Sequence, residues 1–221
     1  MQRATSTHTA HSPAAPRIEL DRDWEAIRTD LFRLGDRVDT GIDRAITALI
    51  HRDKRLAREV MEADQMINDR RYQLEDACLT TMARQQPVAS DLRRLIAAMH
   101  VAGELERMGD LAKGIANIVL KLDAGTRLPL NNLERMAQAV RPMLRSCLYA
   151  FAYEDIELAD RVAVMDDKID QFYQQNLRTL LTYMLEDRDV VKEATYLLWV
   201  SHNLERIGDR CVNVSGRTLR R

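Results

Sequence analysis

The sequence has few aromatic residues, glycines, prolines and cysteines, and it has no long run of apolar residues. Aromatic residues make up 5% of its 221 positions, beside 8 glycines, 5 prolines and 3 cysteines. The cysteines are far apart and lack the spacing of a metal finger or a thioredoxin motif, so we expect small buried side chains. No segment reaches the roughly 18 consecutive apolar residues that a membrane-spanning helix needs.

Neither sign of charge is in excess. Lysine and arginine number 33, aspartate and glutamate 34, which gives a formal net charge of −1. No overall field therefore draws the chain to nucleic acid or to an anionic membrane, and any electrostatic function must be local.

The first seventeen residues differ in composition from the rest of the chain. Met1 to Arg17 is rich in threonine, serine, alanine, histidine and proline, and it has no apolar run of signal-peptide length. We expect a disordered tail over residues 1–17 and a soluble, cytoplasmic protein without direct membrane insertion.

What the sequence does contain is typical of long packed helices. Alanine, leucine, arginine, glutamate and aspartate predominate, and apolar residues recur at helical spacing. Six helices are expected, over about 21–51, 53–84, 88–122, 131–153, 155–186 and 189–219. Pro142 should kink the fourth helix or mark a displaced start. The loop 123–129 divides the chain, so we expect one bundle over residues 18–123 and another over 129–221.

The strongest signal is an internal repeat. The segment Leu105–Asp110 returns almost letter for letter 99 residues later as Leu204–Asp209, and an asparagine follows each copy further along the chain, Asn117 in the first and Asn213 in the second. The preceding helices correspond at an offset of 102 residues, with Asp53 matching Asp155. The fold class predicted is all-α, with two tandem three-helix bundles related by internal duplication, each bundle with its own core.

The repeated segment places acids one helical turn apart. Glu106 and Asp110 share a helix face, as do Glu205 and Asp209, and like charges at this spacing destabilise a helix by roughly a few tenths of a kcal/mol. Neither glutamate has a lysine or arginine three or four positions away. A cation from elsewhere is therefore expected to offset the repulsion.

The aspartates have local basic neighbours. Asp110 can reach Arg107 and Lys113, and Asp209 can reach Arg206, so local ion pairs explain them in part.

Small residues and further acids favour an ion site. Gly109 and Gly208 lie in mid-helix, where the absence of a side chain permits close approach of a neighbouring backbone or a bound ion. Carboxylate and amide oxygens suit hard cations such as magnesium, calcium, manganese or iron better than zinc. The candidate ligands are Asp64, Asn68, Glu106, Asp110, Asp166, Asp170, Glu205 and Asp209, with Asn117, His202 and Asn213 as accessory candidates.

Two alternatives remain open. The acids of a helical interaction module make only salt bridges or bind basic partner surfaces, without metal. A carboxylate-bridged di-iron enzyme on a helical bundle uses Glu-x-x-His, but no glutamate here is followed by histidine three residues later. Since the chain also lacks a phosphate-binding loop and a nucleophile elbow, we expect no enzymatic activity.

Four segments together resemble the PhoU family, the accessory regulators of the bacterial phosphate-specific transport system. They are Gln86–Arg93, Glu104–Asp110, Leu181–Asp187 and Leu204–Asn213. The resemblance covers nearly the whole chain beyond the tail. It implies two three-helix bundles that bind metal, with iron favoured, through acidic motifs at Asp64, Glu106, Asp110, Asp166, Asp170, Glu205 and Asp209.

The resemblance also implies a function that no spacing could show. It implies repression of phosphate-starvation signalling and restraint of phosphate uptake when phosphate is plentiful. The partners implied are the ATP-binding subunit of the phosphate importer and the sensor histidine kinase of the phosphate regulon. A homodimer is also expected, because it is the commonest assembly of such proteins.

One candidate ligand position is acidic in the second half of the chain but not in the first. Asn68 stands where the second half has Asp170. Because a neutral amide binds a cation more weakly than a carboxylate, the second bundle is expected to hold its metal more tightly.

Overall fold

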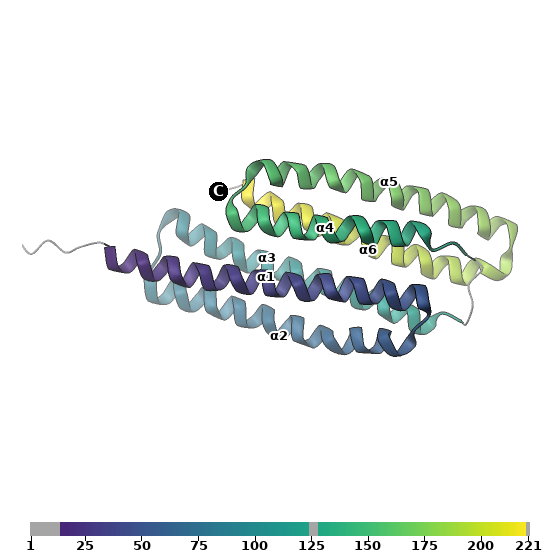
Figure 1. Ribbon diagram of the computed structural model, residues 1–221, viewed down its shortest axis with the longest axis horizontal. Coiled ribbons are helices and arrows are strands. Elements are labelled where there is room, and N and C mark those ends of the chain that lie inside the picture. Colours follow the sequence, from purple (N-terminus) through teal and green to yellow (C-terminus); the bar gives the residue numbers. More distant parts are fainter. Residues whose placement is uncertain (1–13, 124–127, 220–221) are drawn as a thin grey trace, which may run out of the picture.

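Six long α-helices form two three-helix bundles in a computed structural model that describes residues 14–123 and 128–219 (Figure 1). The first bundle contains α1 (Ala14–His51), α2 (Lys54–Gln85) and α3 (Ala89–Lys121). The second contains α4 (Asn131–Tyr153), α5 (Ile156–Glu186) and α6 (Val191–Leu219), with a short 3₁₀ helix, η1 (Arg188–Val190), before α6. The predicted all-α, duplicated architecture is confirmed, and no strand occurs among these residues.

One expectation about a helix end was wrong, and one of the two alternatives for Pro142 is excluded. The first helix begins at Ala14 rather than near Asp21, because alanine favours the helix strongly and Pro16 is tolerated in a first turn. Of the predicted tail, residues 1–13 lie outside the described residues, whereas the next four are helical. Pro142 lies inside α4 and does not displace the start of that helix.

The duplication is visible in the tight turns between the first two helices of each bundle. Asp53 caps α2 by accepting hydrogen bonds from two backbone N–H groups, each 2.9 Å long. Asp155 caps α5 by accepting one from Leu158, also 2.9 Å. The residues just before the caps, Arg52 and Glu154, both adopt the left-handed conformation, with φ of 53° and 57°. The 102-residue register of the repeat therefore holds through this turn.

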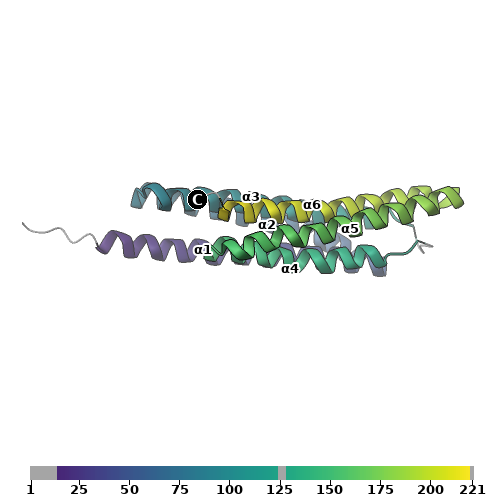
Figure 2. The same ribbon diagram turned by 90° about the horizontal axis from the view of Figure 1, so that it is seen from above.

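The bundles lie side by side with all six helices along one long axis, as the two views show (Figures 1 and 2). Helix α1 packs against α4, and α3 packs against α6, whereas α2 and α5 lie on the outer flanks. The buried apolar side chains form one connected cluster that includes residues of both bundles, such as Leu34, Ile115 and Phe151. The expectation of two separate cores was wrong, because α1, α3, α4 and α6 bury apolar surface against one another.

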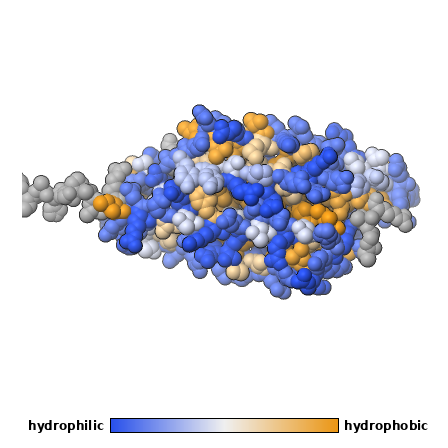
Figure 3. All heavy atoms as spheres, viewed as in Figure 1, coloured by the Kyte–Doolittle hydropathy of each residue, from blue (hydrophilic) through white to orange (hydrophobic). Residues whose placement is uncertain are grey.

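Polar contacts add to this shared core. Arg141 of α4 donates to Asp39 of α1 at 2.7 Å, and Arg210 of α6 pairs with Glu104 of α3 at 3.2 Å. Cys78, Cys147 and Cys211 are free thiols buried in the interior, as expected. One face of the surface is mainly hydrophilic with scattered apolar patches (Figure 3). Within the described part of the chain, no helix combines the length and apolarity needed to cross a membrane.

Candidate metal centre

The predicted acids gather at two corresponding places, between α2 and α3 and between α5 and α6. In each bundle a glycine of the third helix faces the second helix. A Cβ added at Gly109 would lie 2.9 Å from Ile67 Cδ1 and 3.6 Å from Asp64 Oδ1. A Cβ added at Gly208 would lie only 2.6 Å from Asp166 Oδ1. Gly208 therefore lets the Asp166 carboxylate approach the backbone, whereas the closest neighbour of Gly109 is the Ile67 side chain.

The first cluster contains a cation of the protein itself. The ammonium group of Lys113 on α3 donates to Asp64 Oδ2 at 2.7 Å, and the Asn68 amide donates to the same oxygen at 3.4 Å. Asp64 is 3% exposed. The hydrogen bond to Asp64 and the charges of Asp64 and Asp110 raise the pKa of Lys113. Lys113 therefore supplies a positive charge to the buried Asp64 carboxylate from within the protein.

The local ion pairs expected for Asp110 do not form. Arg107 pairs with Glu104 at 2.8 Å, and Lys113 is engaged by Asp64. Burial and the neighbouring Asp110 raise the pKa of Glu106, and the charge of Arg71 on α2 opposes this rise. The first cluster therefore contains Asp64, Glu106 and Asp110 together with cationic groups from both helices.

The second cluster has no lysine at the position of Lys113, where Val212 stands instead. Burial, followed by the charges of Asp170, Asp209 and Glu205, raises the pKa of Asp166 from 3.8 to about 6. Burial and the charge of Asp209 also raise the pKa values of Asp170 and Glu205. No lysine or arginine of the described ranges forms an ion pair with any of these four acids. The ion pair expected between Arg206 and Asp209 is therefore not formed. Four repelling carboxylates thus gather without an ion pair to lysine or arginine in the part of the chain that the structure describes, although the charges of His202 and Arg206 partly oppose the rise in the pKa of Glu205.

One oxygen of this cluster lacks a hydrogen-bond partner. Glu205 Oε2 is buried and accepts no hydrogen bond from the described residues. His202 Nδ1 lies 3.3 Å from it, but the contact does not have hydrogen-bond geometry, and it is an ion pair only when the imidazole is protonated. A buried acceptor without a donor costs about 1–3 kcal/mol, so a cation at this position would stabilise the fold.

The duplicated sequence explains why the clusters differ. Lys113 corresponds to Val212 at the 99-residue offset, and Arg71 corresponds to Tyr173 at the 102-residue offset. Sequence reasoning assigned Lys113 to Asp110 on its own helix and overlooked Arg71. A position-by-position comparison of the two copies could have identified both Lys113 and Arg71, because each is basic in the first copy only.

The remaining expectations about ligands stay predictions. Among residues 14–123 and 128–219, no three histidine, cysteine or acidic side chains are placed as a ready set of metal ligands. Asn117 is half-buried on α3 and Asn213 is exposed on α6, each beyond the aspartate of its helix. The second cluster suits a hard cation, because its donors are carboxylate oxygens, one of them buried without a hydrogen-bond donor among the described residues, beside a glycine that leaves room. The first cluster suits a cation less well, because Lys113 already pairs with one of its acids.

Lowering the pH from 7 to 5 is expected to stabilise the chelator-treated protein through Asp166. The pKa of this carboxyl in the folded chain, about 6, lies above its unfolded value of 3.8, so the folded state binds the proton more tightly. The free energy of unfolding contributed by this group is therefore highest below pH 3.8 and falls as pH rises through 6. Thermal denaturation across this range measures the effect, with Asp166→Asn as the control that lacks it. Identical pH profiles for the two proteins would contradict the assignment.

The fold and the paired acidic motifs define a class: duplicated three-helix-bundle proteins with a Glu-x-x-x-Asp pair facing the preceding helix of each bundle. The family model described as "PhoU domain" matches residues 31–119 and again 133–218. The "Phosphate-specific transport system accessory protein PhoU" of Escherichia coli (strain K12) is 36% identical over 197 residues, which is 89% of this chain and 82% of the relative.

Solved structures agree with this match. The crystal structure of PhoU from Pseudomonas aeruginosa has a TM-score of 0.85 and 33% identity, covering 90% of this chain and 96% of that one. The phosphate transport system regulatory protein PhoU from Streptococcus pneumoniae has a TM-score of 0.84 and 30% identity, covering 90% and 95%. The chain belongs to the PhoU family.

Proposed function

We propose that this protein is a metal-binding, cytoplasmic regulator that represses phosphate-starvation signalling and restrains phosphate uptake when phosphate is plentiful. It acts without catalysis, as a homodimer, between the ATP-binding subunit of the phosphate importer and the sensor histidine kinase. Membership of the PhoU family supports the link to phosphate transport, since its relatives are named accessory or regulatory proteins of that system.

The observation that carries the metal-binding part is the uncompensated second cluster. Asp166, Asp170, Glu205 and Asp209 would hold the ion, and His202, whose Nδ1 lies 3.3 Å from Glu205 Oε2, would be an accessory ligand. The ion supplies the positive charge that Lys113 supplies in the first bundle. Iron is the first candidate because of the family resemblance, and magnesium, manganese and calcium suit the same oxygen ligands.

A second candidate function is a helical adaptor without metal. The ion pair between Lys113 and Asp64 favours it for the first bundle, because a cation of the protein itself already pairs with the buried acid of that cluster. Elemental analysis of protein purified without chelator distinguishes the two. About one ion per chain supports the metal-binding regulator, and none at saturating metal supports the adaptor.

Loss of the protein is expected to switch on phosphate-starvation genes in phosphate-rich medium. A strain lacking the gene should show raised reporter activity, and the wild-type gene on a plasmid should restore repression. The Glu205→Ala/Asp209→Ala variant, produced at the same level, should fail to restore it if the ion is required. Unchanged reporter activity in the deletion strain would refute the regulatory role.

A further inference from the structure

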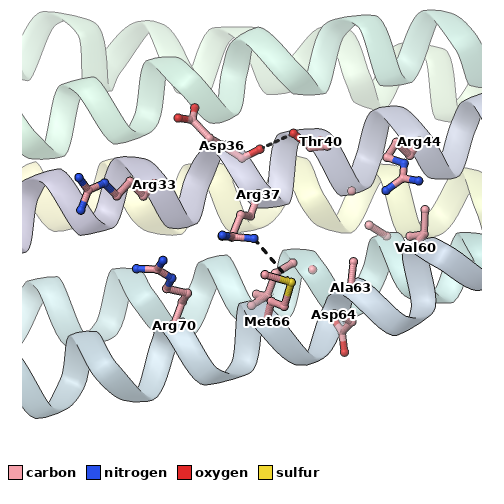
Figure 4. A pocket seen from close by; sticks show the side chains of 14 residues that line it. Arg33, Asp36, Arg37, Thr40, Arg44, Val60, Ala63, Asp64, Met66 and Arg70 are labelled. Atoms are coloured by element: carbon pink, nitrogen blue, oxygen red, sulfur yellow. Dashed lines mark hydrogen bonds between the residues drawn. The ribbon is translucent and has the colours of Figure 1, made fainter.

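A cavity of about 590 Å³ lies between α1 and α2 on the flank of the first bundle (Figure 4). Its floor is made of small and apolar residues, among them Gly41, Val60, Ala63 and Ile67. Pockets of about 300–1,000 Å³ with an apolar lining and a few polar groups are typical sites for small molecules. The size and lining of this cavity therefore suit a small ligand.

Two of the four arginines around the cavity lack a countercharge. Arg33 pairs with Asp30 at 3.0 Å, and Arg44 pairs with Glu59. Arg37 on α1 and Arg70 on α2 form no ion pair within the described residues, and the guanidinium of Arg37 donates a hydrogen bond to the Met66 sulfur at 3.8 Å. Figure 4 shows both guanidinium groups directed into the space between the helices. Two positive charges thus face the same space from opposite walls.

The acids that border the cavity do not neutralise this pair. Figure 4 shows the Asp36 carboxylate directed toward α4 and the Asp64 carboxylate directed away from the space between α1 and α2. Asp64 is also engaged by Lys113 at 2.7 Å. An anion between Arg37 and Arg70 would therefore meet uncompensated positive charge.

The second bundle shows that the fold alone does not require these cations. At the 102-residue offset Arg37 corresponds to Ala139, and Arg70 corresponds to Phe172. Both of these residues line the equivalent space between α4 and α5, which measures about 240 Å³. The smaller space is lined by Arg135 and Lys168 instead, so an arginine pair at these two positions is specific to the first copy.

The hollow itself is also specific to the first copy. Gly41 corresponds to Met143, which is fully buried, and Ala63 corresponds to Met165, which packs against the core. In the second bundle, long side chains fill the space that small residues leave open in the first bundle. The first copy therefore combines a larger space with the arginine pair Arg37 and Arg70.

We propose that the α1–α2 cavity binds a phosphate monoester, with the phosphoryl group between Arg37 and Arg70 and an apolar or aromatic body over the floor. Guanidinium groups match phosphate oxygens with paired hydrogen bonds. A phosphate monoester carries about −1.5 to −2 charges at pH 7, which balances two arginines, whereas a carboxylate would neutralise only one. The apolar floor gives an organic phosphate an advantage over inorganic phosphate.

Phenyl phosphate, inorganic phosphate and phenol separate the parts of this proposal. Titration of the ¹⁵N-labelled full chain, followed through the arginine Nε–H resonances, is expected to show phenyl phosphate shifting Arg37 and Arg70. Its affinity should be about tenfold higher than that of inorganic phosphate or phenol, since each lacks one of the two contacts. Arg37→Ala and Arg70→Phe, which copy the second bundle, should each weaken phenyl phosphate about tenfold.

Two further variants complete the design. Gly41→Met fills the cavity while keeping both arginines, and the Cβ at this position meets nothing closer than Ala112 Cβ at 3.9 Å. This variant should reduce phenyl phosphate affinity to that of inorganic phosphate. Arg135→Ala, in the second bundle, is the matched control and should leave binding unchanged.

Three results would overturn the proposal. They are no binding of phenyl phosphate at millimolar concentration, equal affinity for phenyl phosphate and inorganic phosphate, or binding that both arginine substitutions leave intact. Because the readout requires neither the metal nor phosphate signalling, these results would leave the regulatory function of the protein untouched.

Discussion

Replacing both Glu205 and Asp209 with alanine is expected to lower metal affinity on the order of a hundredfold or more, because loss of ligands costs at least as much as loss of the groups that orient them. The matched variant Glu106→Ala/Asp110→Ala is expected to change the affinity of the tight site by no more than about threefold. The difference follows from the cations, since Lys113 already pairs with Asp64 in the first cluster. Isothermal titration with the metal found in the purified protein measures both variants.

The variants themselves control for unfolding. Removing mutually repelling acids should leave the metal-free protein as stable as the wild type, or slightly more stable. Thermal denaturation in the presence of chelator checks this before the titrations are compared. Equal losses of affinity in the two variants would contradict the assignment of the tight site to the second bundle.

Converting the first cluster to the composition of the second is expected to create another metal site. Lys113→Val removes the ammonium group and installs the residue type of Val212, and Asn68→Asp installs that of Asp170. The double variant should bind one more ion per chain than the wild type, because its acids then lack the Lys113 countercharge. Equilibrium dialysis with elemental analysis measures the stoichiometry.

Stability gives a second readout of the same change. Without Lys113 the buried carboxylate of Asp64 has no cation, and the metal-free variant should lose on the order of 1–2 kcal/mol of unfolding free energy. This is less than the roughly 3–5 kcal/mol for a fully buried pair, since the Lys113 side chain is 41% exposed. Added metal should restore the thermal midpoint through binding to the folded state. A variant that is neither destabilised nor able to take up another ion would show that Lys113 does not act as the internal cation.

The helices and the acidic motifs could be predicted because they depend on local spacing. The cap at Asp53, the apolar periodicity and the repeat of Glu106 and Asp110 as Glu205 and Asp209 each involve residues only a few positions apart. The start at Ala14 was missed because the predicted boundary followed the apolar pattern, whereas the favourable helix propensity of the preceding residues extends the helix.

The pairing of charges could not be predicted in the same way. Lys113 is three residues from Asp110, which made a local ion pair the simplest expectation, yet it binds Asp64, 49 positions away on α2. The shared core could not be predicted for the same reason. Each helix has more than one apolar face, and only the docking of the bundles decides which faces meet.

By itself, the sequence determined six helices, their duplication, and rows of acids one turn apart, because each of these follows from the 3.6-residue period of a single helix. The tertiary structure alone decided that one acidic cluster contains a lysine and the other does not, and that two arginines face each other across a cavity. Charges interact over a few ångströms, and residues distant in sequence come within that range only once the helices have packed.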